Sequence, residues 1–209
     1  HIALPGNIDL ANQRNFVEPD RPRDATDRSP GGLFSHPGHG IGTLGILAGN
    51  RLTGAQPPQV ATGDFLGGAP FARVVPMRIA NSVVQLWTSS VALAIDEARR
   101  LGVDVISMSM GGLPSQAWAD AVNAAYEAGI VIVCAAGNNK ANVPTPNLVW
   151  PARFDRVIAA CGVMADRRPY HNLRPWVMQG NVGPASRMAS AVAAFTPNIP
   201  WARITCGNV

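Results

Sequence analysis

The sequence IVIVCAAGN, residues 130–138, is the clearest indication of the fold, because seven consecutive apolar residues lead directly into a Gly-Asn pair. A short continuous apolar run that is rich in β-branched residues is typical of a strand buried on both faces. The same pattern recurs on both sides of this run, in VDVISMSMGG at residues 103–112 and in VIAACGV at residues 157–163. Residues 73–79 form a further short apolar run. Strands of this kind indicate a parallel sheet with helices on both of its faces.

Two segments between these strands have the periodicity of amphipathic helices. In residues 89–101 the apolar residues recur on one face, and Gly102 can end the helix in a left-handed cap. Ser115 is placed to cap the next helix, which Gly129 ends. The inward stripes consist of Val91, Ala94, Ile95 and Ala98 in the first helix, and of Trp118, Ala121, Val122 and Ala125 in the second. The predicted fold is therefore α/β, a three-layer doubly wound architecture with a mostly parallel sheet, in a single domain over residues 1–209.

The composition is that of a globular protein, with 47% hydrophobic and only 14% charged residues. The net charge of +4 comes from scattered arginines, with Lys140 as the only lysine, so the sequence does not indicate a basic face for nucleic acid. The apolar run at residues 130–136 is far too short to span a bilayer. Cys134 and Cys161 lie in apolar stretches and are predicted core residues, and the cysteines lack metal-ligand spacing.

His39 lies in GHGIGTLGILAG, residues 38–49, a small-residue helix that can pack closely while the imidazole faces a cleft. The glycines also satisfy the dinucleotide fingerprint GxGxxG, but that motif must follow a buried strand and residues 29–37 read as loop. His36 and His39 could instead form a metal pair, although no carboxylate is near them in sequence. A purely structural histidine is the remaining interpretation.

Two further candidates follow the predicted strands, at the sheet edge where parallel α/β proteins place their sites. Asn138, directly after Gly137, could donate its side-chain amide to a developing oxyanion. The side-chain-poor segment Ser109–Gly112 leaves backbone groups open, so that a peptide could pair with it as an added strand. Each segment taken alone could equally be an ordinary turn.

Taken in order, these segments resemble the subtilase family of serine peptidases. The resemblance is carried by the segment around His39, by Gly68-Ala69-Pro70, by residues 105–112 and 131–138, and by Trp150-Pro151-Ala152 ahead of residues 157–160. It covers residues 36–163, and a weaker similarity continues to residue 198.

The resemblance implies a subtilisin-like fold and peptide-bond hydrolysis by an Asp-His-Ser triad. By motif position, His39 would be the general base and Asn138 would hold the tetrahedral oxyanion. The implied substrate-binding residues are Ser109, Met110, Gly111, Gly112 and Gly137. Polypeptides are the implied substrates and secretion the implied localisation. The chemistry needs no cofactor; structural calcium is common in the family, but no segment here matches such a site.

The family's catalytic aspartate has no match in residues 1–38, which read as a polar surface segment. Its four aspartates, Asp9, Asp20, Asp24 and Asp27, read as surface charges. Residues 1–4, HIAL, resemble the stretch that follows the catalytic aspartate in the family. We therefore expect that aspartate just upstream of residue 1.

The nucleophilic serine is also expected outside the chain. Asn181-Val182-Gly183-Pro184 and residues 196–198 resemble segments that precede it in the family, which puts the serine a few residues after Val209. Ser186 is the alternative nucleophile, in a segment that lacks the family's Gly-Thr before the serine. On this alignment the chain is incomplete at both ends and does not hydrolyse peptides by itself.

Two other classes of function stay open. A catalytically inactive relative could bind peptides along Ser109–Gly112, and an unrelated α/β domain could bind a nucleotide at the glycines that follow His39.

Overall fold

A computed structural model describes residues 7–26, 28, 36–51, 63–139, 147–170 and 179–196. The predictions that concern residues 1–4, Asp27, residues 29–35 and residues 197–198 lie outside the described residues. The described residues divide into two compact units, a first unit within residues 7–82 and a second unit within residues 83–196. The single domain over residues 1–209 stays a prediction.

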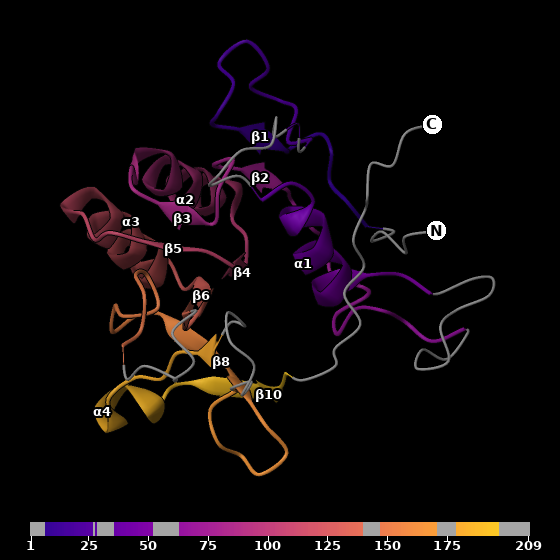
Figure 1. Ribbon diagram of the computed structural model, residues 1–209. Coiled ribbons are helices and arrows are strands. Elements are labelled where there is room, and N and C mark those ends of the chain that lie inside the picture. Colours follow the sequence, from indigo (N-terminus) through magenta and orange to yellow (C-terminus); the bar gives the residue numbers. More distant parts are fainter. Residues whose placement is uncertain are drawn as a thin grey trace. The chain divides into compact units, whose positions relative to one another are not determined.

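The second unit is built on a parallel sheet of four strands in the order β10-β8-β6-β4 (Figure 1). These are β4 (Val105–Met108), β6 (Val131–Ala135), β8 (Ile158–Val163) and β10 (Val192–Phe195). β4 pairs with β6 from Val105↔Val131 onward, and β6 pairs with β8 from Val133↔Ile158 onward. The strands predicted at residues 103–107, 130–136 and 157–163 are confirmed, with ends that differ by one or two residues.

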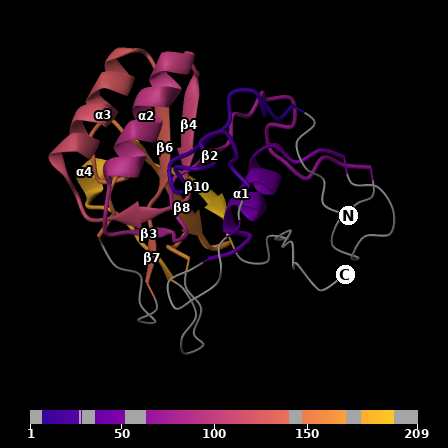
Figure 2. The same cartoon turned by 90° about the horizontal axis from the view of Figure 1, so that it is seen from above.

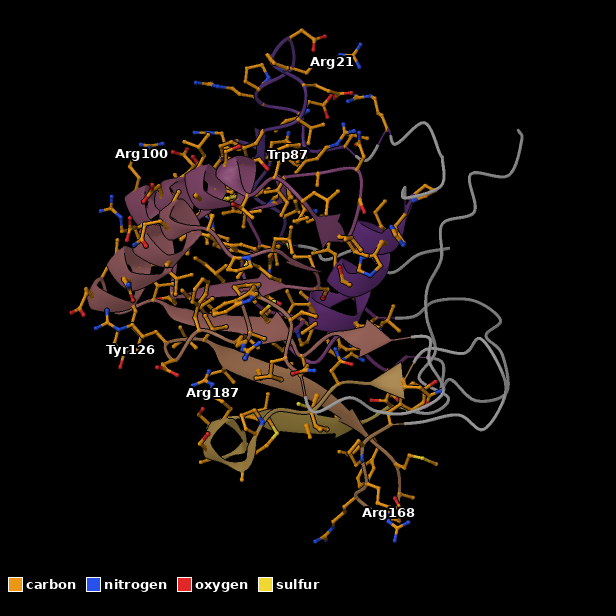
Figure 3. The ribbon with its side chains drawn as sticks, turned by 60° about the vertical axis from the view of Figure 1, so that its left-hand side comes forward. Arg21, Trp87, Arg100, Tyr126, Arg168 and Arg187 are labelled. Carbon is orange, nitrogen blue, oxygen red and sulfur yellow. The ribbon has the colours of Figure 1, made fainter. Side chains whose placement is uncertain are left out.

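Two helices of the second unit pack against each other, α2 (Ser89–Leu101) and α3 (Gln116–Glu127). They lie side by side next to the sheet in both views (Figures 1 and 2). All eight residues of the predicted inward stripes are buried, while Arg100 and Tyr126 project outward (Figure 3). The predicted helix ends are also confirmed: Gly102 is left-handed at φ 67°, and the Ser115 hydroxyl accepts a hydrogen bond from the Trp118 N–H at 3.2 Å.

The strand predicted to be buried at residues 103–107 is in fact an outer strand of the four-stranded sheet. Val105 is 55% exposed, and the side chains of β4 alternate between exposed and half-buried. The apolar run had predicted burial on both faces. Within this unit, however, β4 has a strand neighbour on only one side, and the prediction of a buried strand here was wrong.

Two short ladders and a short helix complete the second unit. β3 (Val84–Gln85) pairs in parallel with β5 (Gly111–Gly112), and β7 (Asn138–Asn139) pairs antiparallel with β9 (Gln179–Gly180). The helix α4 covers Ala185–Met188. Two-residue strands have no measurable periodicity, so the sequence did not predict them.

The first unit contains α1 (His39–Ala48) and a two-stranded parallel ladder of β1 (Arg14–Asn15) with β2 (Met77–Arg78). The helix that begins at His39 was predicted. The run at residues 73–79 is only partly a strand, because Pro76 has no N–H and separates β2 from an isolated bridge between Ile8 and Val74.

The predicted polar surface segment is more ordered than expected, because it contains β1 and the buried Asn15. Asp9 is not a free surface charge either, since its side chain is 7% exposed and bonded to Arg73. With mostly parallel ladders and helices between the strands, the predicted α/β fold class is confirmed.

Candidate active site

The loops after β4 and β6 leave the sheet at the same edge. The two strands are parallel and adjacent, with Met108 opposite Cys134, so the residues that follow them emerge side by side. These residues are Ser109–Gly112 after β4 and Gly137 with Asn138 after β6. The structure thus brings together six of the seven residues that the sequence proposed for the site.

Asn138 is the first residue of β7 and is held by the pairing of that strand with β9. It lies opposite Gly180 in the antiparallel ladder, and the N–H of Asn181 donates to the C=O of Gly137 at 2.9 Å. Gly137 has a φ of 96°, a left-handed conformation that favours glycine. Asn138 itself is exposed, so it can reach a molecule bound at this edge.

Buried polar residues behind this loop were missed by the sequence analysis. Gln179 is 0% exposed and Asn181 is 5% exposed, and both belong to the segment that pairs with Gly137–Asn139. Their polar side chains gave no periodic signal. The only available hint was the Asn-Val-Gly-Pro segment that begins at Asn181.

The segment Ser109–Gly112 is exposed at its first residue and hydrogen-bonded through the backbone at its last two residues. Ser109 is exposed, whereas the side chain of Met110 is buried at 8% exposure. The N–H of Gly111 donates to Val83 C=O at 2.9 Å, and the N–H of Gly112 donates to Trp150 C=O at 3.0 Å. These two N–H groups are therefore not open to a peptide, contrary to what the sequence suggested.

Cys134 lies directly beneath this segment. Its thiol donates to the C=O of Met110 at 3.3 Å, and burial raises its pKa to about 12. A thiol with such a pKa stays protonated and is a poor nucleophile. The prediction that Cys134 is a core residue is confirmed, while Cys161 is half-buried.

His39 is the first residue of α1 and belongs to the first unit. The residue before it, Gly38, has a φ of 75° and begins the helix. The ring is half-buried and lies edge-on to that of His36, with ring centroids 6.4 Å apart. Burial, and to a smaller extent the nearby His36, lower the pKa of His39 below its usual value, which favours a neutral imidazole. Whether His39 meets Asn138 stays a prediction.

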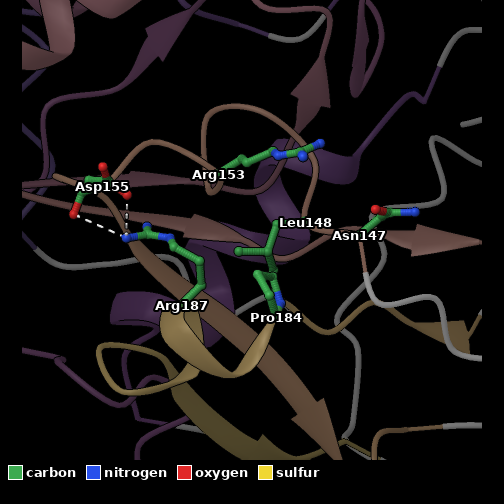
Figure 4. Close-up of a pocket in the computed structure, with 6 residues that line it drawn as sticks. All are labelled: Asn147, Leu148, Arg153, Asp155, Pro184 and Arg187. Atoms are coloured by element: carbon green, nitrogen blue, oxygen red, sulfur yellow. Dashed lines mark hydrogen bonds and ion pairs between the residues drawn. The ribbon is translucent and has the colours of Figure 1, made fainter.

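Ser186, the alternative nucleophile, is an exposed residue of α4. Its neighbour Arg187 has a defined structural role, and Figure 4 shows its contact with Asp155. The Arg187 guanidinium donates to the backbone C=O groups of Ala152, Phe154 and Val157, and to both the C=O and the carboxylate of Asp155. These acceptors converge on one cation and tie α4 to the turn that precedes β8.

A cavity of about 390 Å³ lies beside this arginine. It is lined by Asn147, Leu148, Arg153, Asp155, Pro184 and Arg187 (Figure 4). None of the residues predicted for the site lines it. The guanidinium of Arg187 is turned toward Asp155, and its two terminal nitrogens donate to the turn rather than to the cavity.

The described residues contain no cluster of three or more His, Cys, Asp or Glu side chains that could hold a metal ion. In the same part of the chain, no helix has the length and apolarity needed to cross a membrane.

Known proteins are similar to this chain in sequence. Subtilisin DY of Bacillus licheniformis is 33% identical over 138 residues, which cover 66% of this chain and 50% of that protein. The subtilisin-like protease SBT5.1 of Arabidopsis thaliana is 35% identical over 134 residues, 61% of this chain and 16% of the plant protein. The chain thus spans half or less of the length of these relatives.

The fold has a known relative as well. The structure of the prenylagaramide maturation protease PagA matches 68% of this chain, and the chain covers 49% of that protein, with a TM-score of 0.54 and 20% identity. At this identity the match shows a shared subtilisin-like fold. The family model described as Subtilase family matches residues 1–200, nearly the whole sequence. The chain belongs to the subtilase family.

Proposed function

We propose that the protein containing this chain is a serine endopeptidase, with His39 as general base and Asn138 as oxyanion donor. The observation that carries the proposal is the shared sheet edge, where the exposed Asn138 lies next to Ser109–Gly112. A peptide running along this edge would have its backbone beside the strand ends and one carbonyl within reach of the Asn138 amide. Membership in the subtilase family supports the same chemistry.

In the proposed reaction the serine hydroxyl adds to the carbonyl carbon of the cleaved bond, and its proton passes to the imidazole of His39. A base must be unprotonated to accept that proton. The lowered pKa of His39 favours this, and it places the acid limb of the activity profile below pH ~6.5, the ordinary histidine value. When the tetrahedral intermediate collapses, His39 returns the proton to the leaving amine.

Asn138 would act on the charge that develops during this addition. As the C–O double bond opens, the oxygen becomes an anion, and a preorganised N–H donor stabilises it more than it stabilises the ground-state carbonyl. The ladder with Gly180 and the hydrogen bond from Asn181 to Gly137 hold the loop in place before a substrate arrives. Such preorganisation is what an oxyanion donor requires.

The aspartate and the serine of the triad are proposed to lie upstream of residue 1 and downstream of Val209. The test compares the 209-residue chain with the full-length gene product on an unstructured protein substrate. We expect hydrolysis that is sensitive to serine-directed inhibitors from the full-length protein only. Inhibitor-sensitive hydrolysis by the chain alone that Ser186→Ala abolishes would instead assign the nucleophile to Ser186.

A full-length protein that binds peptides but never cleaves them would be an inactive relative. We propose polypeptides as the substrates and secretion as the localisation, on the basis of family membership. Detection of the protein in the culture medium of its source organism tests the second point.

A further inference from the structure

Asn181 contacts the glycine that precedes the proposed oxyanion donor, through both its backbone and its side chain. Its N–H donates to the C=O of Gly137 at 2.9 Å. Its side chain lies against the same residue, since a Cβ added to Gly137 would be 2.9 Å from Nδ2 of Asn181. Real Cβ contacts are essentially never this short, so the side-chain amide already occupies the space beside the glycine. One residue therefore holds Gly137 at two points.

The conformation of Gly137 determines where the side chain of Asn138 points. Gly137 has a left-handed φ of 96° and lies between β6 and β7. Glycine adopts a wide range of backbone angles at little cost, so its neighbours have to limit its conformation. A rotation about either backbone bond of Gly137 would turn Asn138 away from its present direction. A residue that restrains Gly137 therefore also restrains the amide that is proposed to bind the oxyanion.

The surroundings of Asn181 are themselves fixed. Cγ1 of Val149 would lie 2.5 Å from the same added Cβ at position 137, so the valine and Asn181 enclose the glycine together. The residue before Asn181, Gly180, pairs with Asn138, and its N–H donates to the C=O of Tyr170 at 2.7 Å. Asn181 thus extends from a backbone that is anchored by its own hydrogen bonds, as a positioning residue requires.

Burial of an amide at this position costs free energy. Asn181 is 5% exposed, and moving an amide from water into the interior carries a desolvation cost that an apolar side chain would not have. Proteins depart from apolar packing mainly where a site requires it. A buried amide that lies against the glycine before Asn138 is therefore better explained by a role in the site than by the stability of the core.

We propose that Asn181 is a positioning residue, whose side chain limits the rotation of Gly137 and so keeps the amide of Asn138 directed at the oxyanion. The inference rests on the proposed function, because it needs Asn138 to be the oxyanion donor. Asn181 is buried and acts through Asn138 rather than on the substrate. An error of about 1 Å in the position of a catalytic group can lower a rate by about 100-fold, so a restraint of this kind is measurable.

The test is a double-mutant cycle in the full-length protein, with steady-state kinetics on one peptide substrate. Asn181→Ala keeps the backbone hydrogen bond and removes the side-chain contact with Gly137. We expect it to lower kcat by roughly 10- to 100-fold with little change in KM. In the Asn138→Ala background the same substitution should change kcat by less than about twofold, because the donor that it positions is already absent.

A second variant separates positioning from direct contact with the substrate. Asn181→Leu refills the space beside Gly137 without an amide. It should keep kcat about three- to tenfold above that of Asn181→Ala, because the restraint on the glycine is partly restored. If the amide of Asn181 itself donated to the oxyanion, the two variants would be equally slow, and the positioning role would be wrong.

Val122→Ala is the control for a loss of packing alone. Val122 is 1% exposed and lies in α3, outside β7 and β9. Its truncation lowers stability through a cavity and should leave kcat unchanged in both backgrounds. Melting curves identify the variants that fold. If neither Asn181 variant folds, the residue serves the core rather than the site, and the inference is wrong.

The remaining outcomes separate this inference from the proposed function. An equal loss of kcat from Asn181→Ala in both backgrounds, or no loss in either, would overturn the role of Asn181 and leave the peptidase proposal standing. A normal kcat for Asn138→Ala would remove the oxyanion assignment and this inference with it. A full-length protein that does not hydrolyse peptides would overturn both proposals.

Discussion

The two units of the chain are stabilised in different ways. In the second unit large apolar side chains such as Trp118, Val122 and Ile132 are at most 1% exposed and form a continuous core. In the described part of the first unit, Ala48 is the only buried hydrophobic residue if glycines are not counted. Two polar residues, Asn15 and Arg78, are buried there as well. One unit is thus held by apolar packing, and the described part of the other largely by hydrogen bonds.

The polar network of the first unit centres on Arg78. Its guanidinium donates to the Glu18 carboxylate at 2.7 Å, to the C=O of Thr26 at 3.0 Å and to the Asn81 side chain at 2.9 Å. Asn15 adds a hydrogen bond to the same carboxylate at 3.0 Å. One buried cation therefore joins the segment that contains Glu18 and Thr26 to residues 78–81.

The two residues proposed for catalysis belong to different units, so replacing each of them compares their contributions to the rate. We expect the larger loss of activity from the variant in the first unit. His39→Ala in the full-length protein should lower kcat by about 10⁴-fold or more, because the members of a triad act as a unit. His36→Ala is the control and should retain most of the activity. Near-normal turnover by His39→Ala would remove the first unit from the mechanism.

The variant in the second unit should lower the catalytic rate by a smaller factor. Asn138→Ala should lower kcat by about 10²- to 10³-fold with little change in KM, since the amide acts on the transition state. Steady-state kinetics on a peptide substrate measures the two constants separately. A rise in KM at constant kcat would indicate that Asn138 only binds substrate.

Stability measurements compare the two kinds of packing directly. Trp118→Ala should cost about 3–5 kcal/mol through the cavity it leaves. Arg78→Met should cost roughly 2–4 kcal/mol, because it removes the closer of the two cations that pair with the Glu18 carboxylate, which is 27% exposed, and leaves only Arg28 at 3.9 Å. The exposed residues Tyr126 and Arg100 serve as controls when replaced by Ala and Met.

Hydrogen exchange locates these two effects. Arg78→Met should speed exchange of the Asn15 and Phe16 amides, which donate to the C=O groups of Pro22 and Arg78, and leave β6 unchanged. Trp118→Ala should speed exchange in α3 and β6. If either variant speeds amide exchange equally in both units, the two units unfold together. Their different packing would then not give them different stabilities.

The smallest effect concerns a single helix end in the second unit. Ser115→Ala removes the hydroxyl that caps α3 and should lower the free energy of unfolding by about 1 kcal/mol. Ser115→Asp should restore most of that stability, because aspartate is an equally good cap. Urea titration resolves a change of this size, and an unchanged midpoint for Ser115→Ala would show that the cap contributes nothing.

The same contrast explains how far the sequence could predict the molecule. The helices and strands of the second unit follow from apolar periodicity, which reports burial in an apolar core. β1 consists of Arg14 and Asn15, and nothing in a polar dipeptide indicates a strand. The exposure of β4 was also missed, because an apolar run does not reveal how many strand neighbours it will have.

The candidate site was predictable to a similar extent. Asn138 and Ser109–Gly112 were found because parallel strands place their carboxyl ends at one edge. Val149, whose methyl groups lie against Gly111 and Gly137, was not singled out, since it lies in ordinary loop sequence and only these contacts distinguish it. The pairing of Asn138 with Gly180 links residues far apart in sequence, and no local pattern encodes it.

The hydrogen bonds that surround Arg187 affect how the second unit responds to the composition of the solution. Four backbone carbonyls and one carboxylate form a receptor for positive charge, and the charge that occupies it is covalently attached to the chain. A guanidinium stays protonated at any pH at which proteins fold. This corner of the molecule should therefore be indifferent to dialysis, chelators and the choice of counter-ion, because the ion it needs cannot diffuse away.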